Sequence, residues 1–301
     1  MLSFRKIEKK DIDLIRRFAM HSGIQSCDFT LCGIYLWGVY YKYEICVYKN
    51  TLFVKGVDES GRAAFALPIG EMERSESIKL VCDYCRLHKI EPRFSFVPRC
   101  ALDSFVGGNS LKLEGWSDYI YDAESLKTLA GKKLHKKKNR FNKFEKSYKN
   151  HRFLRVDSEN LCRLADFYQR FKQENPPDSD RLSAEEAIIG RILDEFENLS
   201  LNCGMLEVDG EIVGFAIGER VGDTLYVHFE KALRSFDGAF EAVNCLFVRE
   251  FANGARFVDR EEDMNDLGLR QAKMAYCPEY FVDKYVVVMD VDDEKAVEYQ
   301  G

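Results

Sequence analysis

The sequence predicts an α+β fold with mixed sheets, arranged as two domains. Three observations predict it: the chain has 301 residues, 46% of them are hydrophobic, and short strand-like runs alternate with amphipathic stretches. A membrane-spanning helix needs about 18 consecutive apolar residues, and no run in this sequence is that long. The first residues lack the apolar centre of a signal peptide. We therefore expect a cytoplasmic protein without a transmembrane segment, with peripheral attachment at the inner membrane surface as the alternative.

The first half of the chain reads as strands, turns and one helix. Residues 43–56 predict a hairpin that turns at Lys49 and Asn50, and residues 63–70 and 91–98 predict further strands. The helix between them carries Cys82 and Cys85, whose spacing suits a metal, but no second pair follows. We expect reduced, packed thiols and no metal site.

A basic helical stretch separates the two halves. Asp122 is a candidate N-cap for a long helix that begins at about Glu124. We therefore divide the chain into a first domain at residues 1–122, a basic connecting helix at 123–155, and a second domain at 156–301.

The second half repeats the alternation with clearer boundaries. A helix in 157–177 is predicted to be capped by Asp157 or Ser158 and stopped by Pro176, and the next helix, in 183–199, by a capping box of Ser183 and Glu186. Three strands follow in 201–232, separated by the turn pairs Asp209-Gly210 and Gly222-Asp223. A helix over 238–254 and a strand over 255–263 complete the pattern.

The strands that flank the helix at 238–254 are expected to lie parallel in one sheet, because a helical crossover joins them. Their charged ends then meet at one edge, where ligands of open sheets bind. These ends carry Glu230 and Lys231 on one strand and Arg260, Glu261, Glu262 and Asp263 on the other. The alternative is ordinary solvent-facing charge with no ligand.

Positive charge is concentrated in residues 127–155. That stretch has twelve Lys and Arg against one acid, a net of +11, whereas the whole chain has −6, so the remainder carries −17. Such a cluster favours an anionic partner: RNA, a polyphosphate cofactor or anionic lipid headgroups. The alternative is a cover formed by the protein's own acids.

Three motifs in order resemble the DUF2156 family. They are SDYIYDAESLKTLAGKKLHKKKNRFNKF, VHFEKALRSFDGAF and DREEDMNDLGLRQAKMAYCPEYFVDKY, and they fall within roughly 28–285. The family is similar to the C-terminal catalytic domain of phosphatidylglycerol lysyltransferases, with two tandem GNAT-like domains, and more distantly to the Fem peptidyltransferases. Asp259 and Asn265 depart from the family's asparagine and glycine.

The resemblance implies transfer of an aminoacyl group from aminoacyl-tRNA to a lipid hydroxyl or an amine, with no tightly bound cofactor. Matched to the motifs and the charge pattern, the candidate catalytic residues are Glu230, Glu261, Asp263 and Arg260. The candidate anion-binding and substrate-binding residues are Lys132, Lys133, Lys136, Lys137, Arg140, Lys231, Arg270 and Lys273. The candidate partners are tRNA and an anionic lipid headgroup; the oligomeric state stays open.

Two other functions remain open. An acyl-coenzyme A N-acyltransferase would need a pyrophosphate loop before a helix N-terminus, but the stretch 234–239 has one residue too many and an acid, Asp237, where phosphate would approach. A binding module that holds RNA or an acidic membrane without catalysis is the second. Substituting the candidate carboxylates separates it from an enzyme.

Overall fold

The computed structural model describes residues 2–177 and 179–290. Two compact units make up this part of the chain. Unit 1 contains the described residues of Met1–Ile24, Gly38–Leu113 and Asp283–Gly301, and unit 2 contains those of Gln25–Trp37 and Glu114–Val282. Each compact unit thus combines segments that are distant in the sequence. Our division into three consecutive segments, at residues 122 and 155, stays a prediction.

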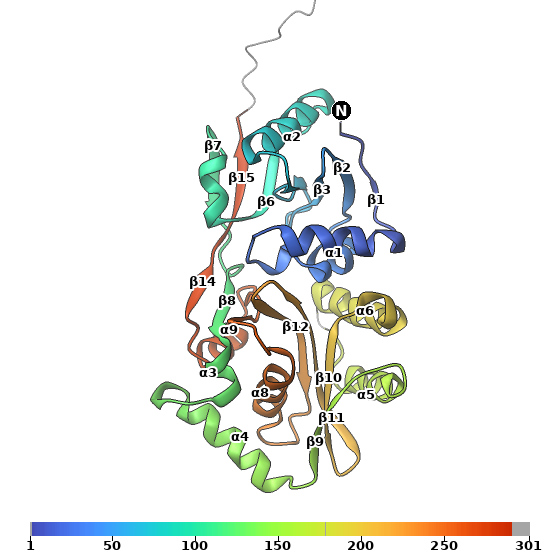
Figure 1. Cartoon of the computed structure of the whole chain (residues 1–301), viewed down its shortest axis with the longest axis vertical. Coiled ribbons are helices and arrows are strands. Elements are labelled where there is room, and N and C mark those ends of the chain that lie inside the picture. The colour runs from blue at the N-terminus through green and yellow to red at the C-terminus, as the bar shows by residue number, and fades with distance from the viewer. Residues whose placement is uncertain (1, 178, 291–301) are drawn as a thin grey trace, which may run out of the picture. The chain divides into compact units, whose positions relative to one another are not determined.

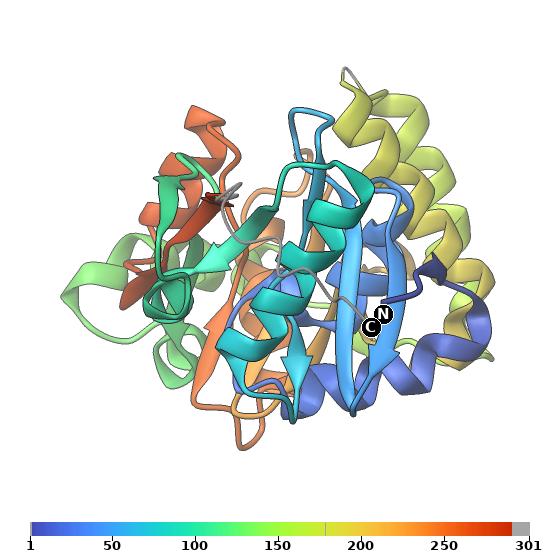
Figure 2. The same ribbon diagram turned by 90° about the horizontal axis from the view of Figure 1, so that it is seen from above.

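Unit 1 is built on a mixed sheet whose strands run in the order β1-β2-β3-β4-β6-β15-β7, with β5 beside β3 (Figure 1). The strands are β1 (Arg5–Lys6), β2 (Glu44–Tyr48), β3 (Thr51–Val57), β4 (Ala63–Phe65), β5 (Ile69–Gly70), β6 (Arg93–Pro98), β7 (Gly108–Lys112) and β15 (Lys284–Met289). Its helices are α1 (Ile12–His21) and α2 (Arg74–His88), and α2 lies against the strands when the molecule is seen from above (Figure 2). The hairpin predicted at Lys49 and Asn50 joins β2 to β3, with both turn residues at positive φ.

Unit 2 is built on a second mixed sheet in the order β14-β8-β13-β12-β11-β10-β9. The strands are β8 (Asp118–Asp122), β9 (His151–Arg155), β10 (Asn202–Val208), β11 (Glu211–Val221), β12 (Thr224–Ala232), β13 (Phe257–Asp259) and β14 (Tyr280–Val282). The helices are α3 (Ala123–Thr128), α4 (His135–Ser147), α5 (Leu161–Glu174), α6 (Asp180–Asp194), α7 (Phe196–Leu199), α8 (Ala239–Phe251) and α9 (Leu267–Met274). In Figure 1, α8 lies on one side of β10–β12, and α5 and α6 lie on the other.

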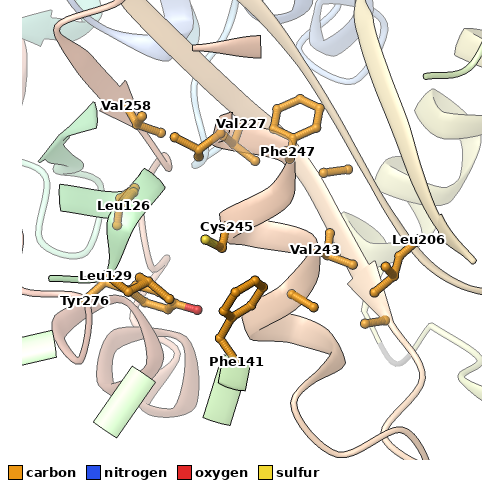
Figure 3. Close-up of a cluster of buried hydrophobic side chains, with 14 of the residues drawn as sticks. Leu126, Leu129, Phe141, Leu206, Val227, Val243, Cys245, Phe247, Val258 and Tyr276 are labelled. Carbon is orange, nitrogen blue, oxygen red and sulfur yellow. The ribbon is translucent and has the colours of Figure 1, made fainter. Parts of the chain in front are cut away.

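The core of unit 2 forms around α8. Val243 and Phe247 of this helix are fully buried, as are Leu206 of β10 and Val258 of β13. Figure 3 shows these side chains pointing toward one another, with Phe141 of α4 beside them. Burial of a large apolar side chain contributes about 1.5–3 kcal/mol, so this cluster fixes α8 and α4 against the sheet.

Three helix boundaries differ from the prediction. The long helix after Asp122 is interrupted: α3 ends where Leu129 takes a left-handed conformation, and α4 begins only at His135. Asp122 does cap α3, since its carboxylate accepts from the backbone N–H of Ser125 at 2.7 Å. A left-handed residue ends a helix by turning its backbone away from the axis, and the sequence showed only Gly131 as a weak point.

The caps of α5 and α6 were also predicted at the wrong residues. The N-cap of α5 is Asn160, because Asp157 holds the turn that precedes it. The N-cap of α6 is Ser179, whose hydroxyl accepts from the N–H of Leu182. Ser and Asp at several neighbouring positions can each cap a helix, and packing decides among them.

Candidate functional site

Strands β12 and β13 are parallel neighbours, as their helical connection predicts. Their paired residues run from Thr224 with Phe257 to Tyr226 with Asp259. Beyond Asp259 the two strands are no longer paired. There Nη2 of Arg260 donates to Oε1 of Glu230 at 3.1 Å. The structure therefore brings together one carboxylate and one guanidinium that the sequence analysis singled out.

The ion pair of Glu230 and Arg260 is almost buried, with 12% of each side chain exposed. Asn244 of α8 donates to the second oxygen of Glu230 at 3.0 Å. The guanidinium of Arg260 also lies 4.7 Å from the ring centre of Tyr276, a cation–π distance. A carboxylate held from both sides is fixed in direction, which suits a group that must orient a substrate.

Glu261 belongs to a different network, centred on His228. The Nδ1 atom of His228 lies 2.7 Å from Glu261 and its Nε2 atom lies 3.0 Å from Glu219. Burial alone would lower the pKa of His228, but Cys32 and the two carboxylates around the ring outweigh it, and the pKa of His228 is raised well above its ordinary value. The raised pKa favours the imidazolium form of the ring, which lies between two carboxylates.

The carboxylate of Asp263 accepts hydrogen bonds from several donors. Arg270 binds it through Nε at 2.8 Å and Nη2 at 2.9 Å, and the hydroxyl of Tyr119 donates to it at 2.5 Å. These donors, together with the N–H of Asn265, outweigh burial and lower the pKa of Asp263. Its arrangement is that of a carboxylate that holds the loop before α9.

Two candidate lysines also have partners within unit 2. Lys231 forms an ion pair with Glu185 of α6 at 2.5 Å. Lys273 donates to the carbonyl oxygens of Arg260 and Glu262, and burial lowers the pKa of Lys273. Both are directed into the protein rather than toward the basic helix.

The basic helix α4 divides its charges between two directions. Lys137 binds the buried carboxylate of Glu241 at 3.0 Å, with Arg140 at 3.6 Å from the same oxygen. The neighbouring lysines are exposed and have no ion-pair partner within residues 2–177 and 179–290: Lys132, Lys133, Lys136 and Lys138. The protein's own acids thus cover only part of the positive charge.

Helix α4 also packs against the N-terminus of α8. Gly238, the N-cap of α8, has φ of +86°, and a Cβ atom there would lie 2.7 Å from the carbonyl oxygen of Arg140. Asp237, one residue earlier, forms ion pairs with Arg140 and with Lys143. Lys143 is the main cause of the lowered pKa of Asp237. Helix α4 thus packs on the N-cap of α8, and an acid with two cationic partners lies beside the position where a helix N-terminus would bind phosphate.

Three further side chains could hold a metal ion. One ligand atom from each of Cys27, Asp118 and Glu262 lies within 4.8 Å of the others, and all three residues are buried. Arg181 binds the other oxygen of Glu262 at 3.0 Å and packs over the ring of Trp116. A thiolate and two carboxylates are ligands that zinc accepts. We expected no metal site from the sequence because Cys82 and Cys85 lack a second pair of ligands. Cys27, Asp118 and Glu262 come from three distant segments, so their spacing along the chain carries no metal signal.

Comparison with known proteins identifies the family. The model of the family "Phosphatidylglycerol lysyltransferase, C-terminal" matches residues 22–288. The chain belongs to this family. That finding confirms the resemblance read from the three motifs.

The family's fold recurs in solved structures. A conserved protein of unknown function from Bacteroides thetaiotaomicron is 27% identical, with 96% of this chain and 100% of that chain covered and a TM-score of 0.89. L-PGS from Bacillus licheniformis is 13% identical, with 96% and 94% covered and a TM-score of 0.68. FemX is 10% identical, with 95% and 96% covered and a TM-score of 0.62. These matches confirm the predicted α+β fold class.

A curated relative adds sequence similarity without a function. It is an uncharacterized protein of Mycoplasmoides gallisepticum, 24% identical over 175 residues, which are 58% of this chain and 56% of the relative. The match thus spans about half the length of that curated relative.

In this member of the family, no helix of the described residues has the length and apolar character needed to cross a bilayer.

Several residues of the site were missed in the sequence. Glu219 lies near the end of the apolar strand β11 and Asn244 lies in the middle of the apolar helix α8, at 8% and 1% exposure. A polar residue on the buried face of such an element costs free energy unless it has partners. Single acids or amides inside apolar periodic runs were therefore the signal that could have found them.

Proposed function

We propose that this member of the family transfers an aminoacyl group from aminoacyl-tRNA to a hydroxyl or amine acceptor. The observation that carries the proposal is that α4 packs on Gly238 at the N-cap of α8, while lysines in α4 and in the turn before it stay exposed to solvent. This packing disfavours coenzyme A, whose pyrophosphate would need the backbone amides at that N-terminus. The exposed lysines favour a long polyanion such as tRNA.

A carboxylate near the reacting centre would suit the cargo. Other buried acids of unit 2 are already held, Glu219 by His228 and Glu262 by Arg181. A carboxylate favours a cationic group, and the α-ammonium of an aminoacyl ester is one. Glu230, at the end of β12, is the carboxylate we assign to the reacting centre.

The transfer can be written with the residues at hand. The acceptor oxygen or nitrogen attacks the ester carbonyl carbon, a new C–O or C–N bond forms, and the bond from that carbon to the ribose oxygen breaks. Glu230 takes the proton from the attacking atom and returns it to the ribose oxygen. Arg260 stabilises the negative charge that develops on the carbonyl oxygen.

The test is a transfer assay with Glu230→Gln. We expect the wild-type chain to release the aminoacyl group from labelled aminoacyl-tRNA to an added alcohol or amine, and E230Q to lose at least about a hundredfold in turnover, the typical contribution of one acid–base group. Affinity for the tRNA should stay unchanged. Glu197→Gln on α7, an exposed position with the same charge change, is the control and should transfer normally.

The same assay distinguishes the rival functions. A binding module would hold tRNA and transfer nothing in wild type or variant. An acyl-coenzyme A enzyme would show turnover with an acyl-coenzyme A donor and none with aminoacyl-tRNA. Either result would contradict the proposal.

A further inference from the structure

The sheet of unit 1 carries a groove of about 430 Å³ that the proposed transfer does not use. Alternate residues of three neighbouring strands line it: Arg93 and Ser95 of β6, Val286 and Val288 of β15, and Leu111 of β7. Alternate residues of a strand point to the same face, and the register pairs Val288 with Arg93 and Val286 with Leu111. The groove is therefore one continuous face of these strands.

The opposite face of the same strands is core. Phe94 lies between the groove residues Arg93 and Ser95, is fully buried, and packs against Phe65 and Phe105 with ring centres 6.2 and 4.9 Å apart. The groove face has no such apolar filling. Its volume is in the range of sites that bind small molecules.

A buried ion pair with incomplete hydrogen bonding lies in the groove wall. Arg93 and Asp58 are 5% and 6% exposed, and Nη1 of Arg93 is 3.6 Å from Oδ2 of Asp58, too far for a hydrogen bond. The other oxygen of Asp58 accepts from the N–H groups of Ser60 and Arg62, and Nε of Arg93 donates to Glu91. Within the described residues, Oδ2 of Asp58 and the terminal nitrogens of Arg93 form no hydrogen bond.

Oδ2 of Asp58 and the terminal nitrogens of Arg93 thus have hydrogen-bonding capacity left at the groove, which a ligand with both a donor and an acceptor can use. A simple anion would be repelled by Asp58 and Glu59 in the same wall, and a simple cation would be repelled by Arg93 and Arg62. A zwitterion satisfies both signs at once.

We propose that unit 1 binds a free apolar α-amino acid in this groove. Its carboxylate would accept from Arg93, its ammonium would donate to Asp58, and its side chain would lie on Val286, Val288 and Leu111. This site is independent of the aminoacyl transfer proposed for unit 2.

The test is calorimetric titration of the full chain with L-leucine and two analogues that each lack one charge. N-acetyl-L-leucine lacks the ammonium, and L-leucinamide lacks the carboxylate. We expect L-leucine to bind, and each analogue to bind at least about tenfold more weakly. The reason is that each analogue loses a charged hydrogen bond to a buried residue. Equal affinity for all three, or no binding of L-leucine, would overturn the proposal.

Variants locate the binding. Leu111→Ala removes an apolar wall at a side chain that is 72% exposed, so it should leave the fold intact and weaken L-leucine binding several-fold. Leu87→Ala, at 55% exposure on α2, is the matched control and should bind as wild type. Arg93→Met should abolish binding. Because it also removes the ion-pair partner of Glu91 and one of the two partners of Asp58, Leu111→Ala is the variant that decides. Unchanged affinity in L111A would place the ligand elsewhere and contradict the site.

Discussion

At the scale of single residues, the His228 network is the strongest electrostatic feature of unit 2. Both ring nitrogens face carboxylates, and Glu219 also accepts from the backbone N–H groups of Leu31 and Cys32. Burial pushes the pKa of Glu219 upward, but the hydrogen bond and charge of His228 outweigh it, so that pKa is lowered. Burial raises the pKa of Glu261. The imidazolium thus holds β12, the loop after β13 and the segment 25–37 together.

Replacing this imidazolium should be costly. We expect His228→Gln to lower the free energy of unfolding by about 3–5 kcal/mol, because it leaves two buried acids without their shared cation. Urea denaturation measures the loss. His135→Gln, an exposed position on α4, should change stability by less than about 0.5 kcal/mol.

The loss in H228Q should depend on pH in a defined direction. The folded pKa of His228 lies above its unfolded value of 6.5, so its contribution is present in full below about pH 6.5 and is lost as pH rises through the folded pKa. The difference between wild type and H228Q should therefore be largest at mildly acidic pH, where Glu219 is still ionised, and should shrink in alkali. A difference that grows from mildly acidic to alkaline pH would contradict the assignment.

The sequence predicted correctly that the charged ends of two strands meet, whereas the catalytic roles of these residues stay a prediction. Glu230 and Arg260 follow apolar runs and were found by that rule, and the structure places them in contact. His228 stood inside the second motif but was not chosen, because a histidine within an apolar strand is usually packed core. Its partner Glu219 lies nine residues away on the neighbouring strand, and sequence periodicity carries no information on that distance.

At the scale of elements, the contact of α4 with α8 is the packing on which our proposal of a donor depends. The backbone of α4 approaches Gly238 so closely that a Cβ atom would lie 2.7 Å from one carbonyl oxygen and 3.0 Å from the Cβ of Phe144. The positive φ of Gly238 adds a conformational requirement that only glycine meets without strain. This glycine therefore allows the close packing of α4 on α8.

We expect Gly238→Ala to destabilise the protein by about 1–3 kcal/mol through overpacking and backbone strain. Gly190→Ala in α6 is the matched control, because nothing lies within 4 Å of the added Cβ atom and alanine is the better helix former, by about 0.5–1 kcal/mol. The two variants should move the urea midpoint in opposite directions. A stability of G238A equal to wild type would show that α4 does not pack on Gly238.

Elements defined by turn chemistry were predicted well from the sequence. The turns at Lys49-Asn50, Asp209-Gly210 and Gly222-Asp223 all join antiparallel strands. Elements defined by tertiary context were not: the return of β15 into the sheet of unit 1 depends on pairing with β6 and β7. Local patterns specify a strand but not its partner.

At the scale of the whole molecule, the uneven distribution of charge is the feature that most strongly indicates an anionic binding partner. The chain carries −6 in total, yet exposed lysines crowd the start of α4. Counterions released from a nucleic acid backbone by such lysines make binding strongly dependent on salt. Coenzyme A, a small ligand, would not show a comparable dependence.

The most direct test is parallel titration of the protein with aminoacyl-tRNA and with acetyl-coenzyme A over a salt series. We predict tRNA binding that weakens steeply with salt, and a slope reduced by about 2–3 in the triple variant Lys132→Ala, Lys133→Ala, Lys136→Ala, since each phosphate contact contributes about 0.7–0.9. The control variant Lys6→Ala, Lys9→Ala, Lys79→Ala removes three exposed lysines of unit 1 and should keep the slope. Saturable, salt-insensitive binding of acetyl-coenzyme A without affinity for tRNA would contradict the account.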